Sequence, residues 1–471
     1  MRFTFNPLYT IMITVWKVKE MVKYHFIAIG GIGMSGLAKY LLEEGHEVSG
    51  SDIENSKYID ALKDLGAKVF IGHNSSNVPN NAIIIASTAI KENNPELVRA
   101  KELGLNIYHR SDLLKEISES AMASNKCFIG FSGTHGKTTT SGLASYVLDK
   151  AGFEPSFVDG GIVPELHTNA QHKNGKFFIA ELDESDGTIT KYNPDILVIN
   201  NLEEDHIDYY KNGLDDLVRT FETALKKAKK VIINADNPGT ALLKGNFITF
   251  GLNNADYTAK NISFTSNKTT FDVYYRDSFL ISLSIMLGGI HNVYNTLAVI
   301  SALNESGVNI ADISKYCNTF EGMGRRFQKA GELNGIKVYD DYAHHPTEIK
   351  ATLDSAAQKY GKEHIVAVFQ PHRYTRLQGL WNEFKQSFDN AKRIIVTDVY
   401  AASENKIDGI SGENFASDLD SAEYIGGPME DVGKNLLPTL KAGDVVIGLG
   451  AGTITNLWKY LSKANGDLAC K

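Results

Sequence analysis

Cysteine is scarce in this sequence, with three residues among 471. Cys127, Cys317 and Cys470 lie far apart and form no CxxC pair, which indicates neither a disulfide framework nor a zinc site and fits a reducing compartment. Long apolar runs are missing too, because the run at residues 8–16 is too short to span a membrane and has no small-residue cleavage site. We therefore expect a cytoplasmic protein with no membrane partner.

An excess of basic residues is absent as well. Asp and Glu number 56 against 48 Lys and Arg, and the resulting net charge of −8 argues against a nucleic-acid partner. Repeats at solenoid spacing and low-complexity tracts are also missing. The 43% apolar and 22% charged residues are typical of a globular protein, and the length suffices for about three domains of ~150 residues.

Short apolar strands alternate with helices along the chain, which predicts an α/β fold with parallel, doubly wound sheets. We predict three domains, at residues 1–124, 125–324 and 325–471. Residues 118–126 are small and polar and are interpreted as a linker. Residues 247–287 alternate Thr, Tyr and Phe with polar residues, which predicts an antiparallel excursion within the central domain. The main strands are predicted at residues 25–29, 47–50, 82–86, 177–180, 196–200, 231–234, 337–339, 365–369, 393–398 and 444–449.

A phosphate-binding loop at residues 130–138 is the most informative motif. Its sequence, GFSGTHGKT, is interpreted as a G-x4-G-K-[ST] loop between an apolar strand and a helix at residues 139–150. Backbone N–H groups of such a loop cradle phosphates, Lys137 neutralises the β- and γ-phosphates, and Thr138 offers its hydroxyl to Mg²⁺. The chain is therefore predicted to bind ATP or GTP.

A second glycine-rich loop, GIGMSG at residues 31–36, lies between the first strand and the first helix, and Asp52 ends the next strand nineteen residues after Gly33. This GxGxxG pattern is typical of a dinucleotide site, so a nicotinamide-dependent oxidoreductase is one hypothesis. A nucleotide sugar fits the same backbone donors, and tight strand–helix packing without a ligand is the third interpretation. Since a dehydrogenase needs no additional phosphate loop, two nucleotide-type sites favour one diphosphate-bearing substrate and one ATP.

Acidic side chains follow two strands of the central segment. Glu181 opens the run ELDESD directly after the strand at residues 177–180, where Mg²⁺ ligands belong beside a phosphate loop. A solvated acidic turn is the alternative. His206 lies in a second acidic turn, after the strand at residues 196–200, and we favour a metal or phosphate ligand over a surface histidine.

Three further groups are candidate ligand contacts. The helix start HNVYN at residues 291–295 offers amides that suit an adenine edge, although Asn there is more often a helix cap. Arg325 and Arg326 lie at the predicted domain junction, where an Arg can clamp a phosphate when domains close, or form a surface pair. Arg373 and Arg376 follow a strand of the third segment and can hold a carboxylate.

Taken together, these motifs closely resemble those of the Mur ligases, the ATP-dependent enzymes that form amide bonds in peptidoglycan precursors. The resemblance covers nearly the whole chain after residue 22. It implies a Rossmann-like N-terminal domain for the UDP-sugar, a central P-loop ATPase-type domain and a Rossmann-like C-terminal domain for the amino acid. The motifs that carry it are GGIGMSGLA (30–38), GTHGKTT (133–139), DESDG (183–187), HNVYN (291–295), GRRF (324–327) and DDYAHHP (340–346).

The resemblance also implies roles for individual residues. The catalytic residues would be Lys137, Glu181, His206 and Arg326. ATP would contact Gly133, Thr134, His135, Gly136, Lys137, Thr138, Thr139, Asn292, Asn295, Arg326 and Asp341. The UDP-sugar would contact Gly30, Gly31, Gly33, Met34, Ser35, Asp52, Ser87 and Thr88. The amino acid would contact Tyr342, His344, Arg373 and Arg376, and Mg²⁺ would bind Thr138, Glu181 and His206.

The function that the resemblance implies is ligation of L-alanine to the carboxylate of UDP-N-acetylmuramate through an acyl phosphate, with ATP and Mg²⁺ as cofactors. The protein would serve cell-wall synthesis as a monomer or homodimer. A sibling ligase that adds another amino acid or a recycled tripeptide, the oxidoreductase and a non-catalytic nucleotide-binding protein are the alternatives. Two features depart from the family: Leu182 stands where Ala is usual, and residues 1–21 have no counterpart, with Met21 as an alternative start.

Overall fold

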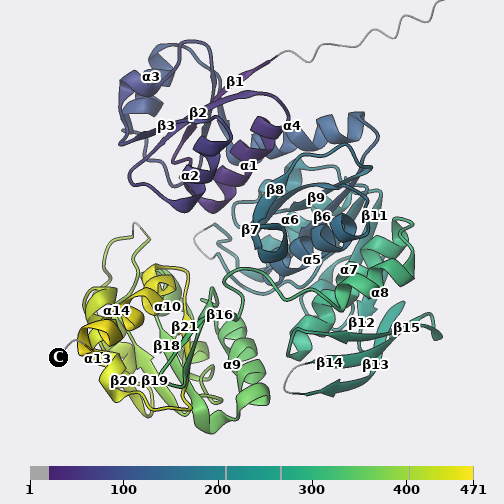
Figure 1. Ribbon diagram of the computed structural model, residues 1–471. Helices are drawn as coiled ribbons and strands as arrows, with labels where there is room; N and C mark the ends of the chain where they lie inside the picture. The colour runs from purple at the N-terminus through teal and green to yellow at the C-terminus, as the bar shows by residue number, and fades with distance from the viewer. Residues whose placement is uncertain (1–20, 207–208, 266–267, 403, 470–471) are drawn as a thin grey trace, which may run out of the picture.

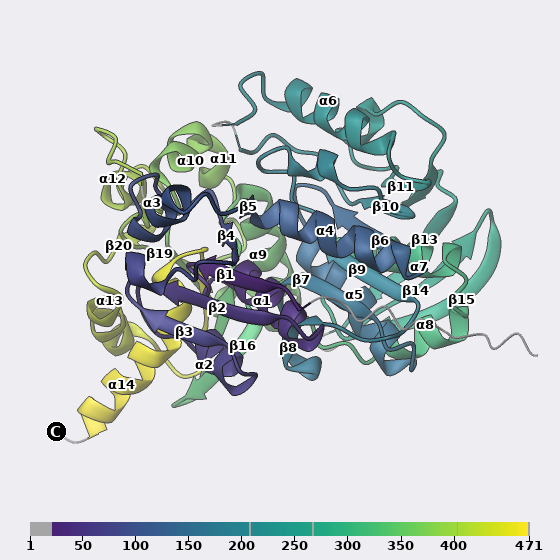
Figure 2. The same cartoon turned by 90° about the horizontal axis from the view of Figure 1, so that it is seen from above.

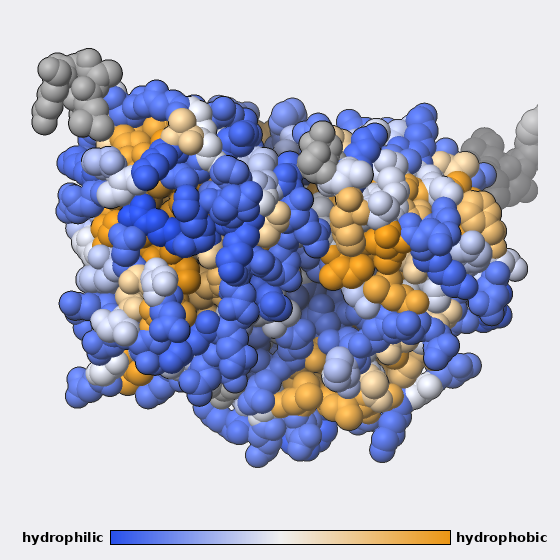
Figure 3. Space-filling model, turned by 90° about the horizontal axis from the view of Figure 1, so that it is seen from below, coloured by the Kyte–Doolittle hydropathy of each residue, from blue (hydrophilic) through white to orange (hydrophobic). Residues whose placement is uncertain are grey.

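Three α/β domains, each built on its own sheet, lie around a common centre in the computed structural model (Figure 1). The structure describes residues 21–206, 209–265, 268–402 and 404–469, so the apolar run predicted at residues 8–16 lies outside it. No helix among the described residues has both the length and the apolar composition needed to cross a membrane. On the face seen in Figure 3, apolar side chains form separate patches among hydrophilic ones.

The first sheet is fully parallel and has the strand order β3-β2-β1-β4-β5, so the predicted doubly wound arrangement is confirmed. Its strands are β1 Lys23–Ile27, β2 Glu47–Asp52, β3 Lys68–Ile71, β4 Ile83–Ala86 and β5 Ile107–His109. Its helices are α1 Ile32–Glu43, α2 Lys57–Asp64, α3 Pro95–Glu102 and α4 Arg110–Ala123.

The predicted linker at residues 118–126 is wrong, because α4 runs through most of it. A capping box between His109 and Asp112 starts this helix, and Ser118 and Ala121 are buried on its inner face. Small side chains here allow close packing, and sequence composition alone does not distinguish that from a flexible connection.

The central sheet has ten strands in the order β15-β14-β13-β12-β11-β10-β6-β9-β7-β8. Its strands are β6 Cys127–Ser132, β7 Ser156–Val163, β8 Thr168–Gln171, β9 Phe177–Glu181, β10 Ile196–Ile199, β11 Lys230–Asn234, β12 Ile248–Gly251, β13 Tyr257–Phe264, β14 Thr269–Tyr275 and β15 Ser278–Ile285. Its helices are α5 Lys137–Lys150, α6 Leu214–Leu225, α7 Ile290–Glu305 and α8 Ile310–Cys317. The predicted antiparallel excursion is confirmed for β13–β15, whereas β12 still pairs in parallel with both neighbours.

The position of β6 determines where the site lies. This strand pairs in parallel with β9 on one side and β10 on the other. The segments that follow all three strands therefore meet at one edge of the sheet, which is where ligands bind in α/β folds.

The third sheet has the order β16-β17-β21-β18-β19-β20, parallel except for the antiparallel pair β16–β17. Its strands are β16 Gln328–Leu333, β17 Ile336–Asp341, β18 Ile365–Phe369, β19 Arg393–Val396, β20 Ala422–Tyr424 and β21 Val445–Leu449. Its helices are α9 Pro346–Tyr360, α10 Tyr374–Gly379, α11 Trp381–Lys385, α12 Gly412–Ser417, α13 Met429–Leu436 and α14 Leu457–Ala469.

The two domain interfaces differ in chemistry. The first and central domains share one apolar core, in which Tyr40 of α1 packs edge-on against Phe178 of β9 with ring centroids 6.0 Å apart (Figure 2 shows α1 beside the central sheet). The third domain has apolar clusters of its own and meets the central domain through polar contacts. These contacts are His135–Glu348 at 3.3 Å, Thr347–Glu203 at 2.8 Å and Arg376–Asp205 at 3.3 Å. A polar interface of this kind is the one expected to open and close.

Candidate active site

The phosphate-binding loop links β6 to α5 and is shaped by two glycines. Gly133 (φ 126°) and Gly136 (φ 81°) adopt positive φ, and a Cβ on Gly133 would lie 2.8 Å from the carbonyl oxygen of Asn201. Asn201, after β10, holds the loop by accepting hydrogen bonds from Thr134 N at 3.1 Å and His135 N at 2.7 Å. The tight turn therefore depends on a neighbouring strand end as much as on its own glycines.

The interpretation of residues 130–138 as a G-x4-G-K-[ST] loop needs correction. Five residues separate Gly130 from Gly136, one more than that pattern allows, and Gly130 and Phe131 both lie within β6. The loop begins at Gly133. Gly130 instead leaves room for Leu182, because a Cβ at Gly130 would lie 2.4 Å from the Cδ1 atom of Leu182.

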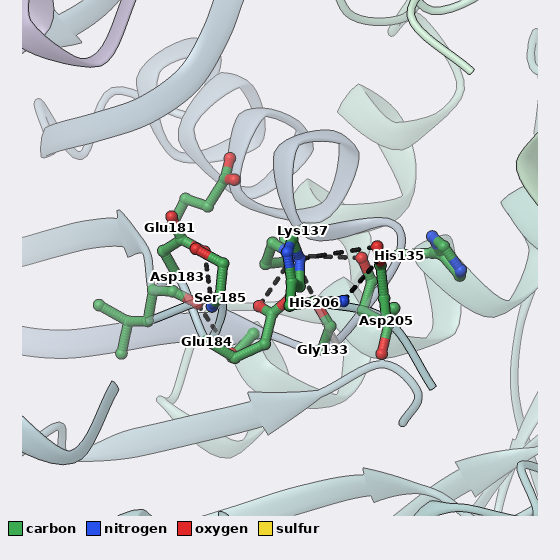
Figure 4. A network of polar contacts seen from close by, with 12 residues as sticks. Gly133, His135, Lys137, Glu181, Asp183, Glu184, Ser185, Asp205 and His206 are labelled. Atoms are coloured by element: carbon green, nitrogen blue, oxygen red, sulfur yellow. Dashed lines mark hydrogen bonds and ion pairs between the residues drawn. The ribbon is translucent and has the colours of Figure 1, made fainter. Parts of the chain in front are cut away.

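Lys137 is the electrostatic centre of the site (Figure 4). Its Nζ donates to the carbonyl oxygens of Gly133 at 2.6 Å and Thr134 at 3.1 Å, and it forms an ion pair with Glu184 at 2.9 Å. Burial acts to lower the pKa of Lys137, but the carboxylates led by Glu184 hold it above the usual value. The ammonium group is therefore a fixed positive charge at the start of α5.

The predicted magnesium-site residues divide into two groups. Thr138 donates its hydroxyl hydrogen to Glu181 at 2.8 Å, and the same carboxylate accepts from Gly160 N at 3.0 Å. His206 lies with other partners, because its Nε2 is 3.7 Å from Glu184 and 3.6 Å from Asp205. Burial lowers the pKa of His206, which keeps its ring neutral and able to offer a nitrogen lone pair. The oxygen donors Thr138 and Glu181 fit a hard divalent cation.

A cavity of about 530 Å³ opens from the phosphate loop between the central and third domains. Asn292 and Asn295 of α7 lie in its wall and bond to each other at 3.1 Å. Arg326 and Asp341 also line it. The Asp341 carboxylate is largely engaged within its own domain, since it accepts from Ala343 N and Phe327 N, each at 2.7 Å. Seven of the eleven residues predicted for the ATP site line this cavity, and Asp341 also anchors the chain that joins the domains. The seven are His135, Gly136, Thr139, Asn292, Asn295, Arg326 and Asp341, whereas Gly133, Thr134, Lys137 and Thr138 do not line it.

A second cavity, of about 400 Å³, lies on the other side of the turn that follows β10. Arg373, Arg376 and His206 line it. Arg376 forms an ion pair with Asp205 at 3.3 Å, whereas Arg373 is paired with Glu404 at 2.6 Å. The two arginines are thus held by different carboxylates. Both line the cavity predicted for the amino acid, together with His206, which was predicted to bind magnesium.

Comparison with known proteins agrees with this arrangement. Family models match residues 23–121 (Mur ligase family, catalytic domain), 131–303 (Mur ligase middle domain) and 325–452 (Mur ligase, glutamate ligase domain). A UDP-N-acetylmuramate–L-alanine ligase of Geotalea uraniireducens is 39% identical over 95% of this chain and 99% of its own. This chain belongs to the Mur ligase family. It is an ATP-dependent ligase that forms an amide bond, and the dehydrogenase hypothesis is wrong.

Two further members of the Mur ligase family support the assignment over the full length. The UDP-N-acetylmuramate–L-alanine ligase of Sulfurihydrogenibium sp. is 40% identical over 94% of this chain and 97% of its own. The crystal structure of UDP-N-acetylmuramate-alanine ligase MurC from Thermotoga maritima superposes with a TM-score of 0.81 at 29% identity, covering 94% of this chain and 99% of that one.

In this Mur ligase the side chain of Asp52 supports the glycine loop of the first domain, a role that the sequence-based prediction did not include. Asp52 accepts a hydrogen bond from Gly30 N at 2.8 Å, so one of its oxygens braces the loop. Met34 and Ser35 are buried, which leaves Gly33 at the opening toward the central domain. Ser87 and Thr88 follow β4, which pairs with β1, and so lie at the same edge of the sheet as the loop. The opening beside Gly33 is also lined by Arg110, Glu181 and Asp183.

Two of the third-domain residues predicted to bind the amino-acid substrate belong to a row of packed rings. Tyr342 packs edge-on against His344 at 5.2 Å, and His344 against His372 at 5.7 Å. His372 in turn bonds to Arg376 at 3.3 Å. Burial lowers the pKa of His344 to about 3 and that of His372 to about 4, so both rings are neutral at pH 7. Tyr342, His344 and His372 do not line the second cavity themselves; they are linked by ring contacts and one hydrogen bond to Arg376, which does. Sequence reasoning assigned no role to His372.

Glu348 of α9 is the most connected residue that sequence reasoning missed in this Mur ligase. It accepts a hydrogen bond from His344 N at 3.1 Å and lies 3.3 Å from His135 and 3.4 Å from Arg326. Burial acts to raise its pKa, but the surrounding His and Arg side chains hold it well below the usual value. The only sequence signal was its place two residues after the DDYAHHP motif. Glu184 lies in the acidic run ELDESD, and Asn201 and Asp205 lie between the strand at residues 196–200 and His206, but sequence reasoning assigned no role to any of the three.

Proposed function

We propose that this chain joins L-alanine to the carboxylate of UDP-N-acetylmuramate, using ATP, in the cytoplasm. The observation that carries the proposal is the meeting of three segments at the edge of the central sheet: the lysine-bearing loop after β6, the acidic run after β9 and the His206 turn after β10. Arginines of the third domain face the same turn. The names of full-length relatives at 39–40% identity supply the identity of the substrates.

The chemistry proceeds in two steps. A carboxylate oxygen of the muramate attacks the γ-phosphorus of ATP, the bond to the β-γ bridging oxygen breaks, and ADP leaves an acyl phosphate behind. The amine of L-alanine then attacks the acyl carbon, phosphate departs with the former carboxylate oxygen, and the nitrogen loses a proton. Because a carboxylate is a poor electrophile, the phosphoryl group turns one of its oxygens into a leaving group.

The protein's contribution is positioning and charge. Lys137 offers a fixed ammonium charge at the loop, and Arg326 adds a second cation from the domain junction. We propose Thr138, Glu181 and His206 as the residues that hold Mg²⁺, which when bound neutralises charge on the phosphates. Asn292 and Asn295 would contact adenine, and Arg373 and Arg376 the alanine carboxylate. The first-domain groups Gly30, Gly31, Gly33, Asp52, Ser87 and Thr88 would hold the UDP-sugar.

The domain limits at residues 124/125 and 324/325 are part of the same proposal. The first lies between α4 and β6, and the second between Gly324 and Arg325, just before β16. The backbone N–H of Arg325 donates to the side chain of Gln328 at 2.9 Å, a local turn that fits a hinge between the central and third domains.

The test measures ADP release with UDP-N-acetylmuramate against L-alanine, glycine, L-serine and a recycled-type tripeptide. We expect release to require both the UDP-sugar and L-alanine, and Lys137→Ala to serve as the inactive control. Release that depends on the tripeptide instead would identify the sibling ligase. Release without either co-substrate would identify an unrelated ATPase and refute the proposal.

A further inference from the structure

A cluster of metal-binding side chains lies outside the groups that the proposed reaction uses for Mg²⁺. It consists of His135 in the phosphate loop, Glu203 after β10 and His345 at the start of α9. One ligand atom from each residue lies within 4.8 Å of the others. Two of the residues belong to the central domain and the third to the C-terminal domain, so the cluster spans their polar interface.

Two buried ring nitrogen atoms of this cluster make no hydrogen bond, although the one on His135 lies 3.5 Å from the Glu203 carboxylate. They are Nε2 of His135 and Nε2 of His345, and His345 is 5% exposed. The two rings face each other with centroids 4.7 Å apart. Burying a polar atom without a hydrogen bond is unfavourable, so two such atoms in a cluster whose ligand atoms lie within 4.8 Å of one another call for a ligand.

The distances fit a small divalent cation. With bonds of ~2.1 Å in tetrahedral geometry, two ligand atoms stand about 3.4 Å apart. His135 Nε2 and Glu203 Oε2 are already 3.5 Å apart. Since the ligand atoms all lie within 4.8 Å of one another, the His345 ring has at most about 1.4 Å to close.

The other nitrogen of His135 is oriented as in a metal-binding histidine. Its Nδ1 faces the carboxylate of Glu348 at 3.3 Å. A ligating histidine usually donates its second ring N–H to a carboxylate, which fixes the ring and makes Nε2 the free ligand atom. The Nδ1 atom of His345 accepts a hydrogen bond from Thr347 N at 3.4 Å, which is near the limit for a hydrogen bond. This bond is weak, so it competes little with metal binding by the His345 ring.

We propose that His135, Glu203 and His345 form a binding site for a transition-metal dication of the Zn²⁺ type, separate from the magnesium site. Two imidazoles and one carboxylate favour Zn²⁺ or Co²⁺ over Mg²⁺, which prefers oxygen ligands alone. Glu203 lines both cavities, His135 the larger and His345 the smaller. A cation there joins the phosphate loop to α9, holds the two domains together, and slows a reaction cycle that needs them to part.

Cobalt binding to the full-length, nucleotide-free protein tests the site. Co²⁺ is titrated in the presence of excess Mg²⁺, and binding is followed by its visible d–d absorption. We expect one bound equivalent in the wild type. His345→Asn, which keeps an acceptor for the helix cap but removes the imidazole, weakens binding at least about tenfold, as does Glu203→Gln.

Glu181→Gln is the matched comparison, because it alters the magnesium site and leaves the three proposed ligands intact. We expect the cobalt affinity of Glu181→Gln to equal that of the wild type. In a separate activity measurement, we expect Zn²⁺ to inhibit His345→Asn less than the wild type, when each rate is compared with the rate of the same protein without zinc. Unchanged cobalt binding in His345→Asn overturns the proposal. So does loss of binding in Glu181→Gln, which would assign the cobalt to the magnesium site.

Discussion

Gly130 and Leu182 fit each other across neighbouring strands beneath the phosphate loop, and this fit can be measured. A Cβ on Gly130 would lie 2.4 Å from Cδ1 of Leu182, which is 0% exposed. The backbone of Leu182 is fixed on both sides, because its N–H donates to Phe131 O at 2.8 Å and its carbonyl accepts from Ser132 Oγ at 2.7 Å. Neither residue can therefore move aside without disturbing the strand ends that carry Glu181 and the loop.

The magnitudes follow from this packing. Leu182→Ala removes a fully buried side chain and leaves a cavity, which costs about 2–5 kcal/mol. Gly130→Ala forces a methyl group into Leu182 and costs about 1–3 kcal/mol. In the double variant, the new methyl group occupies part of the vacated space, so the total cost falls below the sum of the single costs by about 1–3 kcal/mol.

The assay has to report on the central domain. The described tryptophans, Trp381 and Trp458, both belong to the third domain, so native-state amide hydrogen exchange of β6 and β9 is the appropriate measurement. Leu461→Ala, in the core of the third domain, is the control and leaves exchange in β6 unchanged. Strict additivity of the two single variants would refute the packing argument.

Three other predictions concern the site. Lys137→Ala lowers kcat by about 100-fold or more with a native circular-dichroism spectrum, and near-normal turnover would contradict the role of the lysine. Arg376→Lys loses bidentate binding of a carboxylate and raises the KM for L-alanine about tenfold. An effect on the KM for ATP alone would contradict the assignment of Arg376 to the amino-acid site. Burial acts to lower the pKa of His135, but Glu203 and Glu348 raise it to about 9. With a chelator present, the part of this shift that comes from Glu348 favours docking of the third domain; it amounts to less than about 3 kcal/mol and is lost as pH rises through about 9. Small-angle scattering should show that the wild-type protein expands as the pH rises through about 9, and that His135→Gln does not. An identical expansion in the variant would exclude His135 as the origin of the change.

Much of the fold could be predicted because the local signals agreed with the tertiary structure. The apolar strand cores, the helix after the phosphate loop and the change to antiparallel pairing in β13–β15 all follow from periodicity. Residues 118–123 could not be assigned correctly, since small polar residues serve a flexible linker and a tightly packed helix equally well.

The site was predictable where a motif specifies chemistry at one strand end. Thr138 and Glu181 come together as expected, because β6 and β9 are neighbours. The roles of Glu348 and Asp205 were not predictable, since each depends on a contact with another domain, Glu348 with His135 and Asp205 with Arg376. Asp52 illustrates the same limit: the sequence suggested a UDP-sugar contact, and did not reveal that one oxygen of Asp52, at the end of β2, accepts a hydrogen bond from Gly30 N in the glycine loop after β1.

The ion pair between Lys137 and Glu184 has a consequence for how the protein meets its nucleotide. The carboxylates of Glu181, Asp183 and Glu184 all act on Lys137, and Arg110 pairs with Asp183, so the positive charge at the mouth of the loop is already largely neutralised by protein carboxylates. Each added like-charge contact at ~4 Å costs about 4 kcal/mol at an effective dielectric constant of ~20. We therefore expect free ATP to bind less well than a nucleotide that already carries a divalent cation. The occupancy of the enzyme by ATP should then vary with the free magnesium concentration of its surroundings even when the ATP supply is constant.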